Sequence, residues 1–473
     1  MAGSLGKNKG FVNLNILQAF GAANDNLFKQ IIMLGVATGG IWSLELGKGG
    51  QATISLLFSL PFILFGGFAG QFSDKYSKRN VVIFVKMWEV MLAAVCIVAL
   101  ASGNFRLSLF CVIMLGVQST LFSPVKLGII PELVEYKQIT NANGTLGMVS
   151  NIAIILGTAI AGVFSDQYKP AFLGNDLLSS EVSGEEKLAI EQGIEQVAEG
   201  TWLYIPGITI LILAVIGLYC AFQLPKLPAK NPDLKLSFSF RGFFGVYVEQ
   251  FMANLGKPLL AVTGAFSAFF IIAGIALLNI SEYAQYLHVS DTLASAQGAF
   301  LSVAIGIGGV FVGLKSRESV RPRFVLVGGI GMVVGFTILG FLPRNYWLVV
   351  TVLSMSGFFA GLYMIPLQSL LQILTTDENR GRFIGLSSML TMVGFVCGNY
   401  LFKFGSNNFG EHAAPRTYLL CAAVAAIMLI PLSMRWVPWF QRTIDEMAVQ
   451  ELENQDKSQN EGMATQHAGD ESF

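Results

Sequence analysis

Long apolar segments recur along nearly the whole of this chain, and they limit its fold more than any other feature. A helix that crosses a lipid bilayer needs about 20 mostly apolar residues. The sequence has twelve such segments, six before and six after the polar stretch "LPKLPAKNPDLKLSFSFRG". They lie near residues 11–40, 51–72, 81–102, 106–130, 142–165, 202–223, 258–287, 294–314, 324–342, 347–372, 383–404 and 416–438. We therefore predict an all-α integral membrane protein with twelve transmembrane helices in two six-helix bundles.

The residue inventory argues against an enzyme or a nucleic-acid-binding protein. Only 13% of the residues are charged, about half of the share usual in soluble domains, and the net charge is zero. The five cysteines lie in apolar segments without the spacing of a metal site. None of the three histidines has an aspartate five residues on, and neither a GxSxG nor a GxxxxGK[ST] motif occurs. We expect no catalytic residue, no metal, no cofactor and no nucleic acid.

Basic and acidic loops alternate between the two sides of the membrane. The loops "SDKYSKRN" and "LKSRESVRPR" and the central linker are rich in Lys and Arg, whereas the stretch "NDLLSSEVSGEEKLAIEQGIEQVAEG" is acidic. Because cytoplasmic loops carry an excess of Lys and Arg, the basic loops are predicted to be cytoplasmic and the acidic loop external. Both termini are then cytoplasmic.

The same pattern divides the chain into four parts. We predict an N-terminal bundle over 1–223 with an external loop at about 166–200, a cytoplasmic linker over 224–257, a C-terminal bundle over 258–440 and a disordered acidic tail over 441–473. Within the linker, "FRGFFGVYVEQFMANLG" mixes aromatic and polar residues and is expected to form a helix at the membrane surface. The two halves share landmarks at nearly equal spacing, which indicates a duplicated six-helix unit.

The first apolar segment contains the polar stretch "AANDNLFKQ". An aspartate near the centre of a bilayer costs on the order of 3 kcal/mol, so such residues normally face a cavity or a partner. Lys29 lies one helical turn after Asp25, so the two side chains are able to pair. Either they form a structural ion pair, or they line a central cavity together with Asn24 and bind the cargo.

Other polar residues in the apolar segments leave similar alternatives. Lys126 follows Pro124, and it either attracts an anionic group or extends to the membrane interface. Lys86 and Glu89 have the spacing of an ion pair, and they act as a clamp between helices or contact substrate. Glu282 is either a gate residue or a surface residue. Gln368, with Gln372 one turn later, is a hydrogen-bonding group for helix packing or substrate. The predicted substrate-binding residues are Asp25, Lys29, Lys126, Asn24, Glu282 and Gln368.

The loop "GQFSDKYSKR" resembles the signature that the major facilitator superfamily carries between its second and third helices. Gly70, Asp74, Lys75, Lys78 and Arg79 occupy the glycine, aspartate and basic positions of that signature, while Ser77 replaces its second glycine. The resemblance implies the major facilitator fold and a conformational latch, formed by these five residues, that closes the cytoplasmic side in one state of the transporter.

Four further stretches resemble the bacterial lysophospholipid transporter family, whose members include carriers fused to lysophospholipid acyltransferases. These stretches are "FGAANDNLFKQ", "SPVKLGIIPEL", "NANGTLGMVSNIAIILGTAIAG" and "GLYMIPLQSLLQ". Where many relatives have a glutamate this chain has Gly147, and where some have an arginine it has Leu278 and Asn279. The similarity covers about residues 10–440.

The resemblance implies a monomeric alternating-access transporter in the bacterial inner membrane that moves lysophospholipids across or between the leaflets for re-acylation by a separate acyltransferase. Two alternatives stay open. One is a proton-coupled transporter of another small amphipathic solute, in which Asp25 takes up the proton. The other is a non-transporting membrane scaffold that recruits an acyltransferase through its acidic tail.

Overall fold

A computed structural model describes residues 5–36, 42–46, 50–166, 204–236, 240–289, 291–316 and 319–447. Twelve long helices account for most of the described residues. They are α2 (Lys9–Gly35), α4 (Gly50–Lys75), α5 (Lys78–Ala101), α6 (Phe105–Leu133), α7 (Ile139–Asp166), α9 (Ile205–Phe222), α11 (Pro258–Tyr286), α12 (Asp291–Lys315), α13 (Arg323–Phe341), α14 (Tyr346–Ile373), α15 (Arg380–Asn408) and α16 (Ala413–Pro431). Each corresponds to one predicted segment, with ends that differ by a few residues.

Shorter helical elements connect or extend the long helices. They are α3 (Ser43–Leu46), α10 (Phe240–Ala253), the 3₁₀ turns η1 (Tyr136–Gln138) and η3 (Gly410–His412), and the π-helical turn η4 (Leu432–Trp436). The π turn directly follows Pro431, whose ring removes a backbone N–H donor from the helix. Helical structure continues through it to Met447. The predicted external loop and the rest of the predicted tail lie outside the described residues.

Asparagine side chains mark the start of three of the long helices. Asn8 accepts a hydrogen bond from the backbone N–H of Phe11, and Asn104 accepts one from Leu107. Asn345 caps α14 in the same way. Each side chain satisfies one of the N–H groups that a helix leaves without a partner in its first turn, so the local sequence sets where these helices begin.

Eleven helices in the described residues are long and apolar enough to cross a membrane. The twelfth long helix, α2, has 27 residues but is not among them. Its length would suffice to span a bilayer, but Asn24, Asp25, Asn26 and Lys29 reduce its mean hydropathy. The helix that departs from the membrane pattern is therefore the one that carries the polar stretch.

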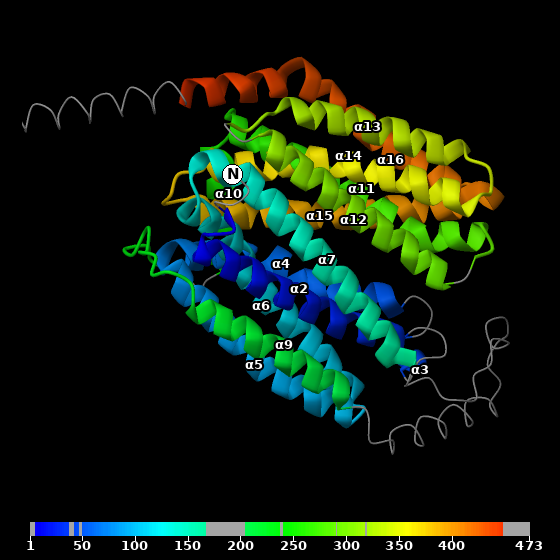
Figure 1. Ribbon diagram of the computed structural model, residues 1–473, viewed down its shortest axis with the longest axis horizontal. Helices are drawn as coiled ribbons and strands as arrows, with labels where there is room; N and C mark the ends of the chain where they lie inside the picture. The colour runs from blue at the N-terminus through cyan, green and yellow to red at the C-terminus, as the bar shows by residue number, and fades with distance from the viewer. Residues whose placement is uncertain are drawn as a thin grey trace, which may run out of the picture.

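The long helices form two groups, one above the other in Figure 1. The N-terminal group contains α2, α4, α5, α6, α7 and α9, and the C-terminal group contains α11 to α16. The groups meet mainly where α4 packs on α15 and where α7 packs on α12. The linker helix α10 contacts both α4 and α15.

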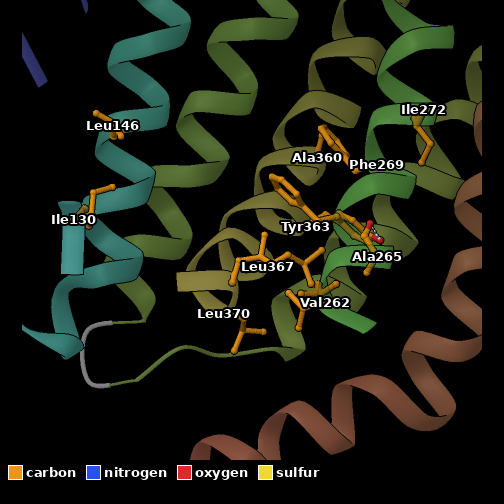
Figure 2. Packing of buried hydrophobic residues seen from close by; sticks show 14 of the residues in the cluster. Ile130, Leu146, Val262, Ala265, Phe269, Ile272, Ala360, Tyr363, Leu367 and Leu370 are labelled. Atoms are coloured by element: carbon orange, nitrogen blue, oxygen red, sulfur yellow. Dashed lines mark hydrogen bonds between the residues drawn. The ribbon is translucent and has the colours of Figure 1, made fainter. Parts of the chain in front are cut away.

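The interior of the C-terminal group is apolar and closely packed. Figure 2 shows Phe269 of α11 beside Tyr363 of α14, with Val262 and Leu367 nearby. The Tyr363 hydroxyl donates a hydrogen bond of 3.0 Å to the carbonyl of Ala265, so the one polar group of this ring has a partner. These contacts hold α11 against α14, and none of them involves a charged side chain.

We refer to the end of the helix bundle where α4 ends and α15 begins as the linker-side end, because the linker residues contact it.

Candidate functional site

A buried hydrogen-bond network occupies the middle of the N-terminal group, and its centre is Glu89 of α5. One carboxylate oxygen accepts hydrogen bonds from the Lys86 ammonium at 2.6 Å and from the Gln118 amide at 2.9 Å. The other accepts a hydrogen bond from Asn24 at 3.1 Å. All four side chains are at least 98% buried. Glu89 therefore joins three helices, α2, α5 and α6, and its charge is balanced by Lys86 within the same helix.

Asp25 lies beside this network, but it has fewer partners. Its Oδ2 atom accepts a hydrogen bond of 2.5 Å from the Ser119 hydroxyl of α6. Its Oδ1 atom is buried and has no hydrogen-bond partner among the described residues. The spacing of Asp25 and Lys29 would allow an ion pair, yet no pair within 4.0 Å forms between them among the described side chains. Asp25 is thus a half-buried carboxylate with one free acceptor oxygen.

Three ammonium groups interact with Asp25 electrostatically, those of Lys86, Lys29 and Lys126. Lys86 is already paired with Glu89. Lys29 points its Nζ over the ring of Phe58, 5.1 Å from the ring centre, and Lys126 lies 5.7 Å from that of Phe122. Neither Lys29 nor Lys126 has a carboxylate within ion-pair distance in the described part of the chain, so the closest contact of each ammonium group is with an aromatic face. The polar stretch of α2 therefore brings Asp25 and Lys29 close to Lys126 of α6, and these two lysines have no ion-pair partner among the described residues.

The two remaining predicted substrate residues lie in the C-terminal group, away from this set. Glu282 accepts a hydrogen bond of 2.6 Å from Ser406 near the opposite end of α11. Gln368 donates to Asn143 of α7 at 3.2 Å and so joins the contact between the two groups. The structure thus brings Asp25, Lys29, Lys126 and Asn24 together and separates Glu282 and Gln368 from them.

Asn143 is the centre of a second amide cluster, which connects the two groups of helices. Its amide nitrogen donates to Gln372 at 2.8 Å, and its amide oxygen accepts from Gln372 at 3.0 Å. It also donates to Ser369 at 3.1 Å. Asn143, Gln372 and Ser369 are fully buried. Reciprocal amide hydrogen bonds of this kind fix the register of α7 against α14.

Asp74, the aspartate of the superfamily signature, spans the interface between the groups at the linker-side end. Its carboxylate accepts hydrogen bonds from the backbone N–H groups of Gly381 at 2.6 Å and Arg382 at 2.9 Å, while the Arg382 guanidinium lies 3.5 Å away. These are the second and third residues of α15, whose own N-cap residue, Asn379, makes no capping hydrogen bond. A side chain from α4 therefore caps the N-terminus of α15, where the helix dipole favours a negative charge.

The other signature residues act in different ways. A Cβ atom at Gly70 would lie 2.5 Å from the carbonyl oxygen of Gly381, so only glycine permits this approach of α4 to α15. Lys78 is buried and pairs with Glu132, and Arg79 donates to the carbonyl oxygen of Leu224 at 2.8 Å. Lys75 lies over the ring of Tyr76. Of the five predicted latch residues, Gly70 and Asp74 contact the C-terminal group directly, while the three basic residues make their contacts inside the N-terminal part of the chain.

The hydrogen bonds and close glycine approaches between the two groups lie at one end of the described molecule. In the described part of the chain, every hydrogen bond and every close glycine approach between the groups lies within about ten residues of the linker-side end of its helix. The deepest of them joins Ser123 to Ser388 at 3.3 Å. Asp25 and Lys29 lie farther from that end than any of these contacts.

Sequence reasoning missed several residues of these clusters. Gln118, Ser119 and Asn143 were not among the predicted site residues, although a search for amides and hydroxyls within apolar segments would have found them. The partner of Asp74, the first turn of α15, cannot be recognised from side chains, because it donates to the Asp74 carboxylate through backbone N–H groups. Within the described residues, no group of three or more His, Cys, Asp or Glu side chains is arranged to hold a metal ion.

Comparison with known proteins agrees with this architecture. The family model of the Major Facilitator Superfamily matches residues 28–317 and 260–451. A lysophospholipid transporter LplT from Salmonella heidelberg (strain SL476) is 24% identical over 436 residues, which cover 89% of this chain and 90% of the relative. The protein of the same name from Salmonella arizonae is 24% identical over 377 residues, 77% of this chain and 80% of the relative.

Solved structures share the fold. The human organic anion transporter MFSD10 (TETRAN) superimposes with a TM-score of 0.71 at 12% identity, over 90% of this chain and 99% of that one. The transporter FucP in its outward conformation superimposes with a TM-score of 0.64 at 16% identity, over 89% of this chain and 97% of that one. At such low identity these structures show a common fold and nothing of the cargo.

Proposed function

The chain belongs to the major facilitator superfamily of secondary transporters, and we propose that its cargo is a lysophospholipid, moved by alternating access across the bacterial inner membrane or between its leaflets. The proposal is supported by two lysophospholipid transporters that are each 24% identical to this chain, over 77% and 89% of its length. It is supported independently by the polar groups around Asp25. A separate acyltransferase would then re-acylate the delivered lipid, because the chain lacks the residues for that reaction.

The observation that carries the proposal is the free acceptor oxygen of Asp25 beside the two ammonium groups of Lys29 and Lys126. A lysophospholipid head group has an anionic phosphate, and in many cases an amine as well. The phosphate would interact with Lys29 or Lys126, and the amine would donate to Asp25. The single acyl chain would lie against the surrounding apolar side chains, including Phe58 and Phe122.

The contacts between the helix groups support a specific state of the transport cycle. If the basic loops are cytoplasmic, as their Lys and Arg content favours, the linker-side end is the cytoplasmic end, and the structure is closed on that side. Gly70 and Asp74 would then form the latch that keeps it closed, and Lys78 and Arg79 would hold the ends of α5 and α9 in place behind it. Opening the latch would give the cargo access to the cytoplasmic side.

A second candidate is a proton-coupled transporter of another amphipathic solute. It is favoured by the absence of an ion-pair partner for Asp25 among the described residues, because an unpaired carboxylate inside a membrane protein is a common proton site. This candidate differs from the first in its cargo and requires a pH gradient for transport.

The test is uptake of labelled lysophosphatidylethanolamine into proteoliposomes containing the purified protein, with and without a pH gradient. We expect uptake by the parent and a loss of at least about tenfold in Asp25→Ala, since the variant removes the group that receives the amine. Asn26→Ala is the matched control, because among the described residues the Asn26 amide donates to the carbonyl of Ala22 in its own helix and to no other group. Failure of a folded parent to take up the lipid under either condition would reject lysophospholipid as cargo, and uptake only with a gradient would add proton coupling.

A further inference from the structure

The linker between the two groups crosses the closed end of the bundle and contacts both groups. At its start, the carbonyls of Phe222 and Leu224 accept hydrogen bonds from Arg79, and the carbonyl of Leu227 accepts one of 2.6 Å from Ser77. The backbone N–H of Asn231 then donates to the backbone carbonyl of Asp74 at 3.0 Å. The linker therefore follows the end of α4 as far as the residue that caps α15.

From this position the linker reaches the C-terminal group through Lys230. Its ammonium group lies 2.8 Å from the Asp377 carboxylate, in the loop that precedes α15. Asp377 also pairs with Arg380 at 2.7 Å. Lys230 and Asp377 come from opposite sides of the interface that Asp74 closes, so this ion pair forms only while the two groups are close together at this end.

The second half of the linker, helix α10, is joined to α4 by Tyr247. The Tyr247 hydroxyl accepts a hydrogen bond of 2.7 Å from the backbone N–H of Gly67 and donates one of 3.0 Å to the carbonyl of Ile63. In a regular α-helix these two backbone groups bond to each other. The hydroxyl therefore bridges one step of the α4 hydrogen-bond ladder, next to Gly66 and Gly70, where α4 approaches α15 most closely.

Tyr247 is suited to this position by its burial and by the glycines around it. The side chain is 5% exposed, and a Cβ atom at Gly66 would lie 3.1 Å from its hydroxyl. Burial raises the pKa of Tyr247 to about 12, so the hydroxyl keeps the proton that it donates to Ile63. On the same helix, Glu249 lies 3.6 Å from the guanidinium of Arg382, which also faces Asp74.

We infer that the linker is a strap, made of residues 223–236 and α10, that stabilises the closed state of the linker-side end by connecting α4 to the loop before α15. Lys230 provides the connection across the interface, and Tyr247 holds α10 on helix α4. The connection between the two halves is then part of the gate, in addition to joining the halves covalently. This inference concerns the conformational equilibrium and does not depend on which cargo is carried.

The test measures the distance between spin labels at Glu135 and Lys315 in the full-length protein in nanodiscs, without substrate. Both residues are exposed at the linker-side ends of their groups, and the exposed Cys397 is replaced by serine beforehand. We expect Lys230→Ala to raise the open-to-closed ratio about two- to fivefold, as loss of a partly exposed ion pair would. Lys226→Ala, which removes an exposed linker lysine outside the ion pairs of the described residues, is expected to leave the ratio unchanged.

A double-mutant cycle identifies the contact. In an Asp377→Ala background, Lys230→Ala should have no further effect, because the partner is already absent. Tyr247→Phe removes only the hydroxyl and should also favour the open state, whereas Tyr219→Phe, on the exposed face of α9, should not. An unchanged ratio in both Lys230→Ala and Tyr247→Phe, or an equal effect of Lys230→Ala with and without Asp377, would overturn the strap.

The ion pair at Asp377 is expected to persist over the physiological pH range. Partial burial raises the pKa of Asp377, but the hydrogen bond from Lys230 and the charge of Arg380 outweigh it, and the net pKa is lowered. A lowered pKa means that the stabilisation is present above the usual carboxylate pKa of about 4 and is lost only in stronger acid. The open-to-closed ratio of the parent should therefore not change through this pair between about pH 5 and pH 8.

Discussion

Two carboxylates in the same part of the N-terminal group have different surroundings, and this difference indicates different roles. Glu89 accepts hydrogen bonds from three side chains and has Lys86 as its counter-ion. Asp25 has one hydroxyl donor and a free oxygen. A fully partnered buried charge stabilises a unique packing, whereas a partly partnered one is available to a ligand. We therefore assign Glu89 to structure and keep Asp25 as the proposed substrate residue.

The structural assignment of Glu89 predicts a strong asymmetry between single and double variants. Lys86→Met leaves the Glu89 charge buried without its cation, and such a loss typically costs about 3–5 kcal/mol. Lys86→Met combined with Glu89→Gln removes both charges and should cost clearly less. Thermal unfolding of the purified variants in detergent measures the difference. Equal thermal stability of the single variant and the parent would contradict the structural role of the pair.

Sequence alone predicted the interactions of single residues only in part. The three-residue spacing of Lys86 and Glu89 indicated their pairing, because both lie on one helix face. The same reasoning allowed Asp25 to pair with Lys29. In the structure, Asp25 instead accepts a hydrogen bond from Ser119, and Lys29 lies over the ring of Phe58, each partner coming from another helix. Such choices depend on how the helices pack, and that information is distant in sequence.

At the level of elements, the sequence predicted the helices well and their contacts poorly. Length and apolar content place each long helix within a few residues, because the bilayer sets both quantities. The α10 segment was also expected as a short helix between the halves. The spacing of Gly66 and Gly70 predicts close helix packing, but it does not identify α15 as the partner helix. Small residues at this spacing occur in many membrane helices, so the match with Gly381 and Gly385 becomes visible only in the structure.

This glycine interface gives a prediction for α4. A Cβ atom at Gly70 would lie 2.5 Å from the Gly381 oxygen and 2.6 Å from the Arg382 Cα, and both belong to backbone that is unable to move aside cheaply. Overpacking of this kind costs about 1–3 kcal/mol, so Gly70→Ala should lower the closed-to-open ratio at least about fivefold. Label distances between positions 135 and 315 report this ratio.

Gly162→Ala is the matched control for Gly70→Ala. Gly162 lies in the membrane helix α7, and a Cβ atom there meets nothing within 4 Å. Its replacement should leave the label distances unchanged. A Gly70→Ala protein with the distances of the parent would show that α4 and α15 do not have to approach each other this closely.

The molecule as a whole is electrostatically asymmetric. The buried or half-buried charges near the middle of the helices, Asp25, Lys29, Lys86, Glu89 and Lys126, all belong to the N-terminal group, whereas the C-terminal group contributes apolar and amide side chains there. The closed end in turn depends on both groups and on the linker. Under the proposed function, the N-terminal group recognises the head group and the C-terminal group moves against it.

The position of Asp74 gives a prediction for the whole molecule. Asp74→Asn keeps an acceptor oxygen but removes the charge and one of the two acceptors that face α15. We expect a larger shift toward the open state than for Lys230→Ala, and slower transport. Cargo binding should stay measurable, because the proposed binding residues Asp25, Lys29 and Lys126 are not altered. Label distances and equilibrium binding of the lysophospholipid give the two readouts. Loss of binding with unchanged label distances would argue against a latch at Asp74.

The cap that α4 supplies to α15 links the gate to local folding. While the two groups are in contact, the first turn of α15 is completed by a side chain from the other half of the chain. When they separate, the amide groups of Gly381 and Arg382 lose that acceptor and have only water to replace it. The start of α15 is then expected to fray, so each opening of the transporter includes a small unfolding step, and each closure completes the helix again.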